Sequence, residues 1–295
     1  MVEAFEKGGQ RAWFHDHGHF GGFFHTYDTL QLSGFGAHFD QPRKVHVFIP
    51  RDYEVSQTHY PVLYCNDGDD IFFPDGESGQ SWQVAELLSR MYLREQISKI
   101  IVVAICSGDR QYEYSHVPEN GGGLEGYSHY LAKGLKPFID GNYRTKADKT
   151  LLLGASRGGL AAFYTATQHP RQFPNLAALS PSFWLGLEKQ PQDINSLETA
   201  FKISLQHSAL IFAATPTLSN TALRPQIYLD WGCQGDRQNP YEDRARLRGY
   251  EMRDLLAREF GYQENIDLFT VEDVLGQHTI ESWRRRLTMV LQLFF

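Results

Sequence analysis

Residues 150–160 read TLLLGASRGGL, a stretch that changes from an apolar run to a helical pattern at its centre. Three structures compete for it: a turn without chemistry, a phosphate-binding loop, or a strained turn that exposes a nucleophilic serine. A P-loop needs Lys followed by Ser or Thr after its glycines, and a dinucleotide-binding loop needs G-x-G-x-x-G. Neither pattern is present. The spacing Gly154-x-Ser156-x-Gly158 between a strand and a helix instead favours a nucleophile elbow, in which side chains two residues before and after the serine would clash.

Short and nearly continuous apolar runs recur from residue 61 onward, which is typical of strands covered on both faces. These runs are PVLYCND (61–67), KIIVVAIC (99–106), TLLLGAS (150–156), NLAALS (175–180), QIYLDWG (226–232) and NIDLFTVE (265–272). Helical patterns lie between and after them, at 81–96, 127–143, 158–170, 239–262 and 280–295. The alternation predicts an α/β fold with a mostly parallel central sheet and helices on both faces. Period-two alternation at 25–36 and 43–53 predicts antiparallel strands at the N-terminal edge.

The chain shows no internal repeat, low-complexity tract or Pro/Gly/Ser linker, so we expect a single domain over residues 1–295. Residues 1–25 form an N-terminal extension rich in His, Gly and aromatic residues. The least regular stretch is 181–221, with a helical pattern at 196–208. We interpret this stretch either as an insertion that builds a substrate pocket or as a surface crossover connection.

Composition excludes several classes of protein. The 295 residues carry a formal net charge of −7, which argues against nucleic acid as a partner. The three cysteines, Cys65, Cys106 and Cys233, are expected to be free thiols. Because no apolar signal segment or membrane-length apolar stretch is present, we expect a cytoplasmic protein without a membrane span. The sequence gives no indication of oligomeric state.

A serine nucleophile needs a base, and three histidines follow Ser156: His169, His207 and His278. His169 ends the helix after the elbow, and His207 lies in the irregular segment. His278 stands between the last strand and the final helix, where a loop can bring an imidazole beside the elbow. We therefore predict that His278 is the base.

The acid that orients the base is expected after the strand at 226–232. Asp236, in the loop GCQGDRQ, is the first choice, with Asp230 and Asp243 behind it. Asp230 alternates within the strand, and Asp243 would favour the helix dipole. Glu242 fits a capping box at the third helical position, with Asn239 as N-cap and Pro240 at the first.

Two backbone amides should bind the oxyanion, and we expect them from Arg157 and Asp69. Arg157 follows the nucleophile, and Asp69 lies in the polar turn after the strand at 61–67. An ordinary Asx turn is the alternative there. Phe183, Trp184 and Trp231 are predicted to line the substrate pocket.

Six stretches together resemble the putative esterase family of α/β hydrolases, which includes esterase D-like enzymes, ferric enterochelin esterase and some carbohydrate acyl esterases. They are PVLYCNDGDDIF, DRQYEYS, LAKGLKPFIDGNYRT, LLLGASRGGLAAFYTATQHPRQFPNLAALSPSFW, IYLDWG and GQHTIESWRRRL. The resemblance runs from about Val45 to the C-terminus and implies an α/β-hydrolase fold. It places the nucleophile on Ser156, the base on His278 and the acid near Asp236. Asn66 stands where the family has histidine, and the acid loop is one residue longer after Gly232 than a common family spacing.

The sequence therefore predicts a serine esterase that uses a catalytic triad of Ser156, His278 and Asp236 on a small-molecule ester. A thioesterase, a carbohydrate-ester hydrolase and a non-catalytic scaffold that binds a ligand or protein are the alternatives. No cofactor is expected. His15, His17 and His19 would share one face of an extended chain, and a metal site formed by these three side chains is the alternative there. We predict that no metal is bound.

Overall fold

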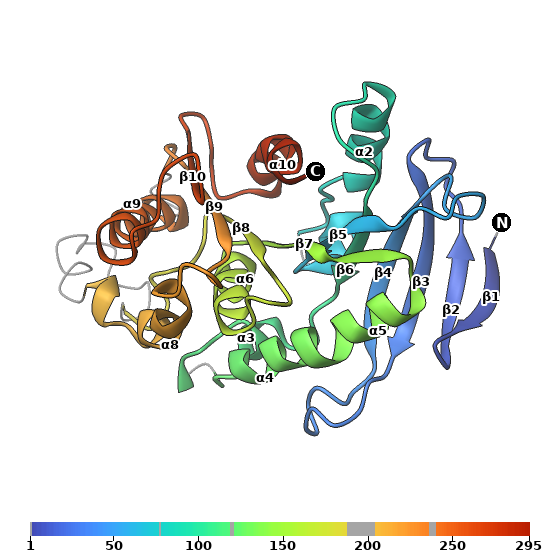
Figure 1. Ribbon diagram of the computed structural model, residues 1–295, viewed down its shortest axis with the longest axis horizontal. Helices are drawn as coiled ribbons and strands as arrows, with labels where there is room; N and C mark the ends of the chain where they lie inside the picture. Colours follow the sequence, from blue (N-terminus) through green and yellow to red (C-terminus); the bar gives the residue numbers. More distant parts are fainter. Residues whose placement is uncertain (1, 77, 119–120, 188–203, 236–239) are drawn as a thin grey trace.

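The computed structural model describes residues 2–76, 78–118, 121–187, 204–235 and 240–295. Within them, ten strands form one sheet in the order β1-β2-β3-β4-β6-β5-β7-β8-β9-β10 (Figure 1). Neighbouring strands from β1 to β4, and β4 with β6, are antiparallel. Every pair from β6 to β10 is parallel. The predicted α/β fold, with a mostly parallel sheet and an antiparallel N-terminal edge, is confirmed.

The strands are β1 (Val2–Lys7), β2 (Gln10–His15), β3 (Gly22–Leu30), β4 (Arg43–Pro50), β5 (Tyr60–Cys65), β6 (Ile101–Ile105), β7 (Thr145–Ala155), β8 (Asn175–Leu179), β9 (Gln226–Gly232) and β10 (Leu268–Asp273). The α-helices are α1 (Gly68–Ile71), α2 (Val84–Leu93), α3 (Arg110–Glu113), α4 (Leu124–His129), α5 (Lys136–Asn142), α6 (Arg157–Gln168), α8 (Ala209–Leu218), α9 (Tyr241–Phe260) and α10 (Ile280–Phe294). A π-helical segment, Tyr130–Leu135, joins α4 to α5, and a 3₁₀ turn, Leu205–His207, precedes α8.

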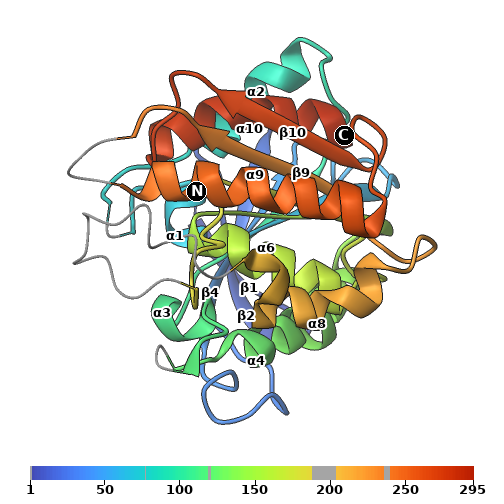
Figure 2. The ribbon, with the colours of Figure 1, turned by 90° about the vertical axis from the view of Figure 1, so that its left-hand side faces the viewer.

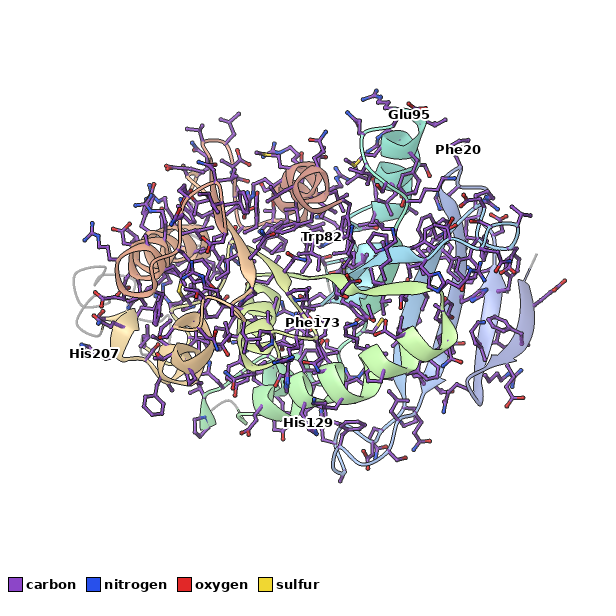
Figure 3. The ribbon with its side chains drawn as sticks, viewed as in Figure 1. Phe20, Trp82, Glu95, His129, Phe173 and His207 are labelled. Atoms are coloured by element: carbon purple, nitrogen blue, oxygen red, sulfur yellow. The ribbon has the colours of Figure 1, made fainter. Side chains whose placement is uncertain are left out.

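Helices cover both faces of the sheet. One hydrophobic cluster joins the sheet to α1, α2 and α10, and a second joins it to α4, α5, α6, α8 and α9. Figure 1 shows α2 and α10 above the sheet and α4, α5, α6 and α8 below it, and Figure 2 shows α9 running along β9. In Figure 3, Trp82 and Phe173 lie inside the molecule, where they are buried, while Glu95 and His207 lie at its edge. Burial on both faces explains why the central strands β5, β6, β8 and β9 are apolar without alternation.

The N-terminal extension is part of the sheet. β1 and β2 form a hairpin through Gly8 and Gly9, whose φ angles are 62° and 71°. A two-residue loop with positive φ at both positions is a common hairpin connection, and glycine adopts it without steric cost. The pair Gly8-Gly9 is thus typical of a β-hairpin turn, whereas the sequence prediction gave residues 1–25 only as an extension without strands.

The irregular segment contains a helix that the sequence prediction did not include. Residues 196–203 of the predicted helix lie outside the described residues, and its end, at 205–207, is only a 3₁₀ turn. The described part of this region holds α8, which begins after Ser208. The Ser208 hydroxyl accepts a hydrogen bond from the Ile211 amide at 3.2 Å, as N-cap residues do. None of the helices that the structure describes is both long and apolar enough to cross a lipid bilayer.

Buried histidines in the antiparallel strands should make the fold acid-labile. Burial lowers the pKa of His25 and of His46 to about 3. The unfolded chain therefore takes up these protons below about pH 6.5, whereas the folded protein does not. Stability is fully present above pH 6.5 and is lost as the pH falls toward 3, by about 1.4 kcal/mol per pH unit for each histidine. Urea unfolding at pH 7, 6, 5 and 4 measures this slope.

The double variant His25→Phe, His46→Gln removes both groups and should reduce the slope between pH 6 and 4. The slope that remains comes from groups such as His15 and His169, whose pKa values burial lowers to about 4. His59, an exposed histidine, gives the matched control His59→Gln, which should keep the wild-type slope. A double variant with an unchanged slope would contradict the prediction.

Candidate active site

The strand-to-helix turn at Ser156 has the backbone of a nucleophile elbow. Ser156 lies between β7 and α6 with φ 55° and ψ −123°, a conformation that non-glycine residues rarely adopt. Its amide donates to the Leu179 carbonyl at 2.9 Å, and its carbonyl accepts from the Ser182 amide at 3.0 Å. A Cβ atom on Gly154 would lie 2.1 Å from the carbonyl oxygen of Gly158. The turn therefore requires a residue without a side chain at position 154, because only glycine lets the two backbone segments approach this closely.

His278 lies against the elbow serine. Its loop connects β10 to α10, and the Nε2 atom lies 2.8 Å from the Ser156 Oγ atom. The imidazole packs edge-on against Trp283, with ring centroids 5.1 Å apart. His169, by contrast, is at the far end of α6 and contacts His129. The structure thus brings Ser156 and His278 together in the geometry of a hydroxyl and its base.

Glu242 is the carboxylate on the other imidazole nitrogen. Its Oε2 atom lies 2.9 Å from Nδ1 of His278. Its Oε1 atom accepts hydrogen bonds from the Ser180 hydroxyl at 2.8 Å and from the Gly232 amide. Burial by itself raises the pKa of Glu242, but the hydrogen bond from His278, with those from Gly232 and Ser180, holds that pKa below its ordinary value. Glu242 is therefore built to carry a negative charge beside the imidazole.

The capping-box interpretation of Glu242 is wrong. Helix α9 begins at Tyr241 with Pro240 as its N-cap, so Glu242 is the second helical residue and its carboxylate turns inward to the sheet edge. Asp236, the first choice for the acid, lies outside the described residues. Asp243 is paired with Arg246 at 3.0 Å on the surface of α9.

Asp230 belongs to a buried network behind Glu242. Its Oδ1 atom accepts from the Ser180 amide at 3.1 Å, and its Oδ2 atom lies 2.9 Å from Nε of Arg286. Arg286 also donates to the Ser180 hydroxyl at 2.7 Å. Burial raises the pKa of Asp230 to about 6, although the Arg286 guanidinium opposes this change. Through Ser180, the pair of Asp230 and Arg286 fixes the hydroxyl that donates to Glu242.

The turn after β5 lies directly against the elbow. The Asn66 side-chain amide donates to the Gly158 carbonyl at 2.8 Å, and its side-chain oxygen accepts from the Tyr127 hydroxyl at 2.7 Å. A Cβ atom on Gly158 would lie 2.7 Å from Asp67 Oδ2. The Arg157 amide begins α6, and Asp69 lies in α1, the short helix that follows this turn. The role of the Asp69 amide stays a prediction.

The three predicted pocket aromatics lie in different places. Trp184 lies near the imidazole, with ring centroids 6.1 Å from His278. Phe183 and Trp231 are 1% exposed and belong to the hydrophobic core, where Phe183 packs on Phe163. The prediction that these two side chains line the pocket is wrong, because core packing covers them. Sequence reasoning missed Tyr241, which is 40% exposed and lies 5.8 Å from His278 by ring centroids.

The three N-terminal histidines do not converge on a common point. His15 Nδ1 lies 2.8 Å from His17 Nε2, and His15 Nε2 lies 2.7 Å from the Thr26 hydroxyl. The rings of His17 and His19 stack at 6.3 Å. In the part of the chain that the structure describes, no three His, Cys, Asp or Glu side chains are placed to hold a metal ion. The nitrogens of His15 are thus taken up by neighbouring side chains.

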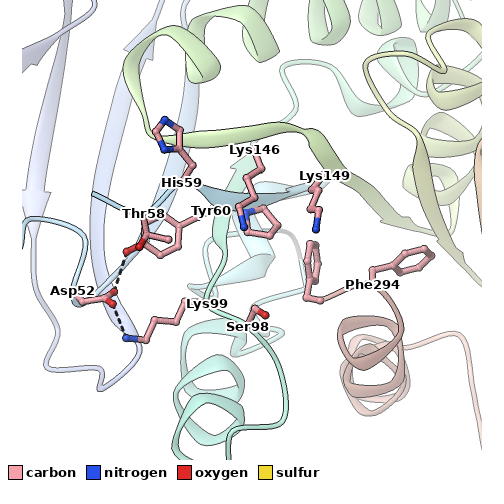
Figure 4. Close-up of a pocket in the computed structure, with 11 residues that line it drawn as sticks. Asp52, Thr58, His59, Tyr60, Ser98, Lys99, Lys146, Lys149 and Phe294 are labelled. Carbon is pink, nitrogen blue, oxygen red and sulfur yellow. Dashed lines mark hydrogen bonds and ion pairs between the residues drawn. The ribbon is translucent and has the colours of Figure 1, made fainter. Parts of the chain in front are cut away.

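A separate pocket of about 370 Å³ lies at the N-terminal ends of the central strands β5 and β7 (Figure 4). Tyr60, which begins β5, lines it together with Lys146 and Lys149 from the first half of β7. Asp52 accepts from Lys99 at 2.8 Å and from the Tyr60 hydroxyl at 3.2 Å. Because Ser156 follows the other end of β7, this pocket is distinct from the site of Ser156 and His278.

Comparison with known proteins gives the same family that the sequence motifs resemble. The model of the family described as putative esterase matches residues 36–294. The uncharacterized protein YbbA of Bacillus subtilis (strain 168) is 24% identical over 169 residues, which are 53% of this chain and 63% of that protein. The iron(III) enterobactin esterase of Escherichia coli (strain K12) is 30% identical over 114 residues, 37% of this chain and 27% of that protein. The chain thus spans less than two thirds of the length of these relatives.

The fold comparison covers more of the chain. A solved structure titled ferulic acid esterase superimposes with a TM-score of 0.65 at 20% sequence identity, and the match covers 93% of this chain and 98% of that one. At this identity the likeness concerns the fold. The ten-stranded sheet described above is accordingly an α/β-hydrolase fold.

Proposed function

The chain belongs to the putative esterase family, and we propose that it hydrolyses carboxylic esters through a covalent acyl-enzyme on Ser156. The observation that carries the proposal is one continuous hydrogen-bonded line. Ser156 Oγ lies 2.8 Å from Nε2 of His278, and Nδ1 of His278 lies 2.9 Å from Oε2 of Glu242. A nucleophile, a base and an orienting carboxylate in this order are the parts that acyl transfer requires.

In the first half-reaction, Ser156 Oγ attacks the ester carbonyl carbon while its proton moves to His278 Nε2. The Arg157 amide and a second amide, for which Asp69 is the candidate, bind the oxyanion of the tetrahedral intermediate. The intermediate expels the alcohol, which takes the proton from His278, and the acyl group stays on Ser156. Glu242 stabilises the imidazolium formed in this step and holds Nδ1 as a donor.

In the second half-reaction, water attacks the acyl-enzyme carbonyl and His278 accepts its proton. The second intermediate collapses, Ser156 leaves with that proton, and the carboxylic acid is released. The scheme uses no cofactor. Glu242 takes the place that was predicted for Asp236, because in the part of the chain that the structure describes Glu242 is the carboxylate that contacts His278.

Short-chain 4-nitrophenyl esters, acylated sugars and thioesters, each given to the purified protein, test the proposal. We expect hydrolysis of the 4-nitrophenyl esters and labelling by a fluorophosphonate at one serine per chain. His278→Ala should lose most of the activity and the labelling, whereas the control His169→Ala should keep both, because His169 is at the other end of α6. A protein that neither reacts with the fluorophosphonate nor cleaves any of these compounds would support a non-catalytic scaffold. Cleavage of thioesters alone would favour a thioesterase.

A further inference from the structure

Arginine is an unusual residue at position 157. It is the first residue of α6, directly after the proposed nucleophile, and it is half-buried. A cation at a helix N-terminus is disfavoured by the helix dipole. Among the residues that the structure describes, no hydrogen bond or ion pair of its guanidinium offsets this cost. The five N–H donors of Arg157, the residue next to the proposed nucleophile, therefore have no acceptor within the described part of the chain.

The charged groups around Arg157 add to the positive potential. Burial lowers the pKa of Arg157, and the Arg110 charge lowers it further, whereas Tyr241 raises it. Arg110 itself is bound by Asp67 through two hydrogen bonds, Nε to Oδ1 at 2.6 Å and Nη2 to Oδ2 at 3.0 Å. The Asp67 carboxylate is thereby engaged by Arg110, and among the described residues no carboxylate is paired with Arg157.

Two aromatic side chains lie beside His278 in the same site. The rings of Trp184 and Tyr241 stack at 6.1 Å, and Tyr241 is partly exposed. Both rings lie within about 6 Å of the His278 ring by centroid distance. A substrate held at Ser156 would therefore lie close to these two rings and to Arg157, the next residue along the chain.

We propose that Arg157 binds a carboxylate carried by the ester substrate, close to the scissile bond, and so selects anionic esters. This inference rests on the proposed esterase function. A guanidinium presents paired donors that match the two oxygens of a carboxylate, and such charge-assisted hydrogen bonds are stronger than neutral ones. The substrate carboxylate would supply a negatively charged partner for Arg157. Removal of water from the site on binding strengthens the attraction between the carboxylate and the guanidinium.

Two pairs of esters test the proposal and separate the possible positions of the carboxylate. 4-Nitrophenyl hemiglutarate, with the carboxylate on the acyl group, is compared with its neutral glutaramate counterpart. 4-Carboxyphenyl butyrate, with the carboxylate on the alcohol group, is compared with 4-carbamoylphenyl butyrate. We expect the wild type to prefer the anionic member of at least one pair in kcat/KM. In Arg157→Gln that ratio should fall roughly 10- to 100-fold, the loss typical of a charged hydrogen-bonding partner. The ratio within one variant cancels any effect of the substitution on the oxyanion site.

Two further variants serve as controls. Arg157→Lys keeps the charge and should retain part of the preference. Arg171→Gln, in the exposed turn that follows α6, should retain all of it. Hydrolysis of neutral esters with a ratio that Arg157→Gln leaves unchanged in both pairs would overturn the inference and leave the proposed function standing. A wild type that hydrolyses none of the four esters, cleaves no acylated sugar and does not react with the fluorophosphonate would overturn both.

Discussion

Replacement of Ser156 by alanine is expected to lower kcat by on the order of 10³ or more, because no other group then forms the acyl-enzyme. The fold should persist. Alanine removes one hydroxyl, while the backbone hydrogen bonds of this residue to Leu179 and Ser182 do not involve its side chain. Steady-state hydrolysis of 4-nitrophenyl butyrate measures the first effect, and the thermal unfolding midpoint measures the second.

Ser182 provides the matched control, since its hydroxyl lies 3.2 Å from that of Ser156 and is buried. Ser182→Ala should lose far less activity, because the Ser182 hydroxyl has no hydrogen bond to His278 among the described contacts. Peptide mapping after fluorophosphonate treatment should find the label on Ser156. Label on Ser182, or full activity in Ser156→Ala, would refute the assignment of the nucleophile.

The central part of the fold and the elbow were predictable because both leave local signals. Strands buried on both faces must be apolar throughout, and the turn at Ser156 needs Gly154 and Gly158 whatever surrounds it. The contact of His278 with Ser156 was predictable because His278 follows the last strand, and the chain order of this fold places that loop beside the elbow. The hairpin of β1 and β2 left a signal in Gly8 and Gly9 that could have been read.

The pocket aromatics and the acid were not predictable in the same way, because tertiary packing decides them. Phe183 and Trp184 are adjacent in sequence, yet one packs on Phe163 in the core and the other faces His278. Glu242 looks like an ordinary residue of a first helical turn. Its function as a partner of His278 depends on where β9 and α9 place the helix start and on the donors from Ser180 and Gly232.

The acid assignment gives the second large expected effect. Glu242→Gln keeps the size of the side chain and an oxygen that can accept from Ser180 and Gly232, but it removes the negative charge beside His278. The imidazolium formed during attack loses its stabilising partner, and the amide can hold the imidazole in the wrong tautomer. We expect kcat to fall by about 10² to 10⁴, with a smaller change in KM. Rates at saturating 4-nitrophenyl butyrate, with the unfolding midpoint measured in parallel, check this result.

Two isosteric substitutions nearby decide whether the effect belongs to Glu242. Asp243→Asn changes the next residue of α9, which pairs with Arg246 on the surface, and should alter kcat less than about threefold. Asp236→Asn tests the carboxylate that loop position alone favoured, and it should behave like Asp243→Asn if Glu242 orients the base. A collapse of kcat in Asp236→Asn with near-normal kcat in Glu242→Gln would transfer the role to Asp236. Ser156 and His278 would keep theirs, because the 2.8 Å contact between them does not depend on which acid lies behind the imidazole.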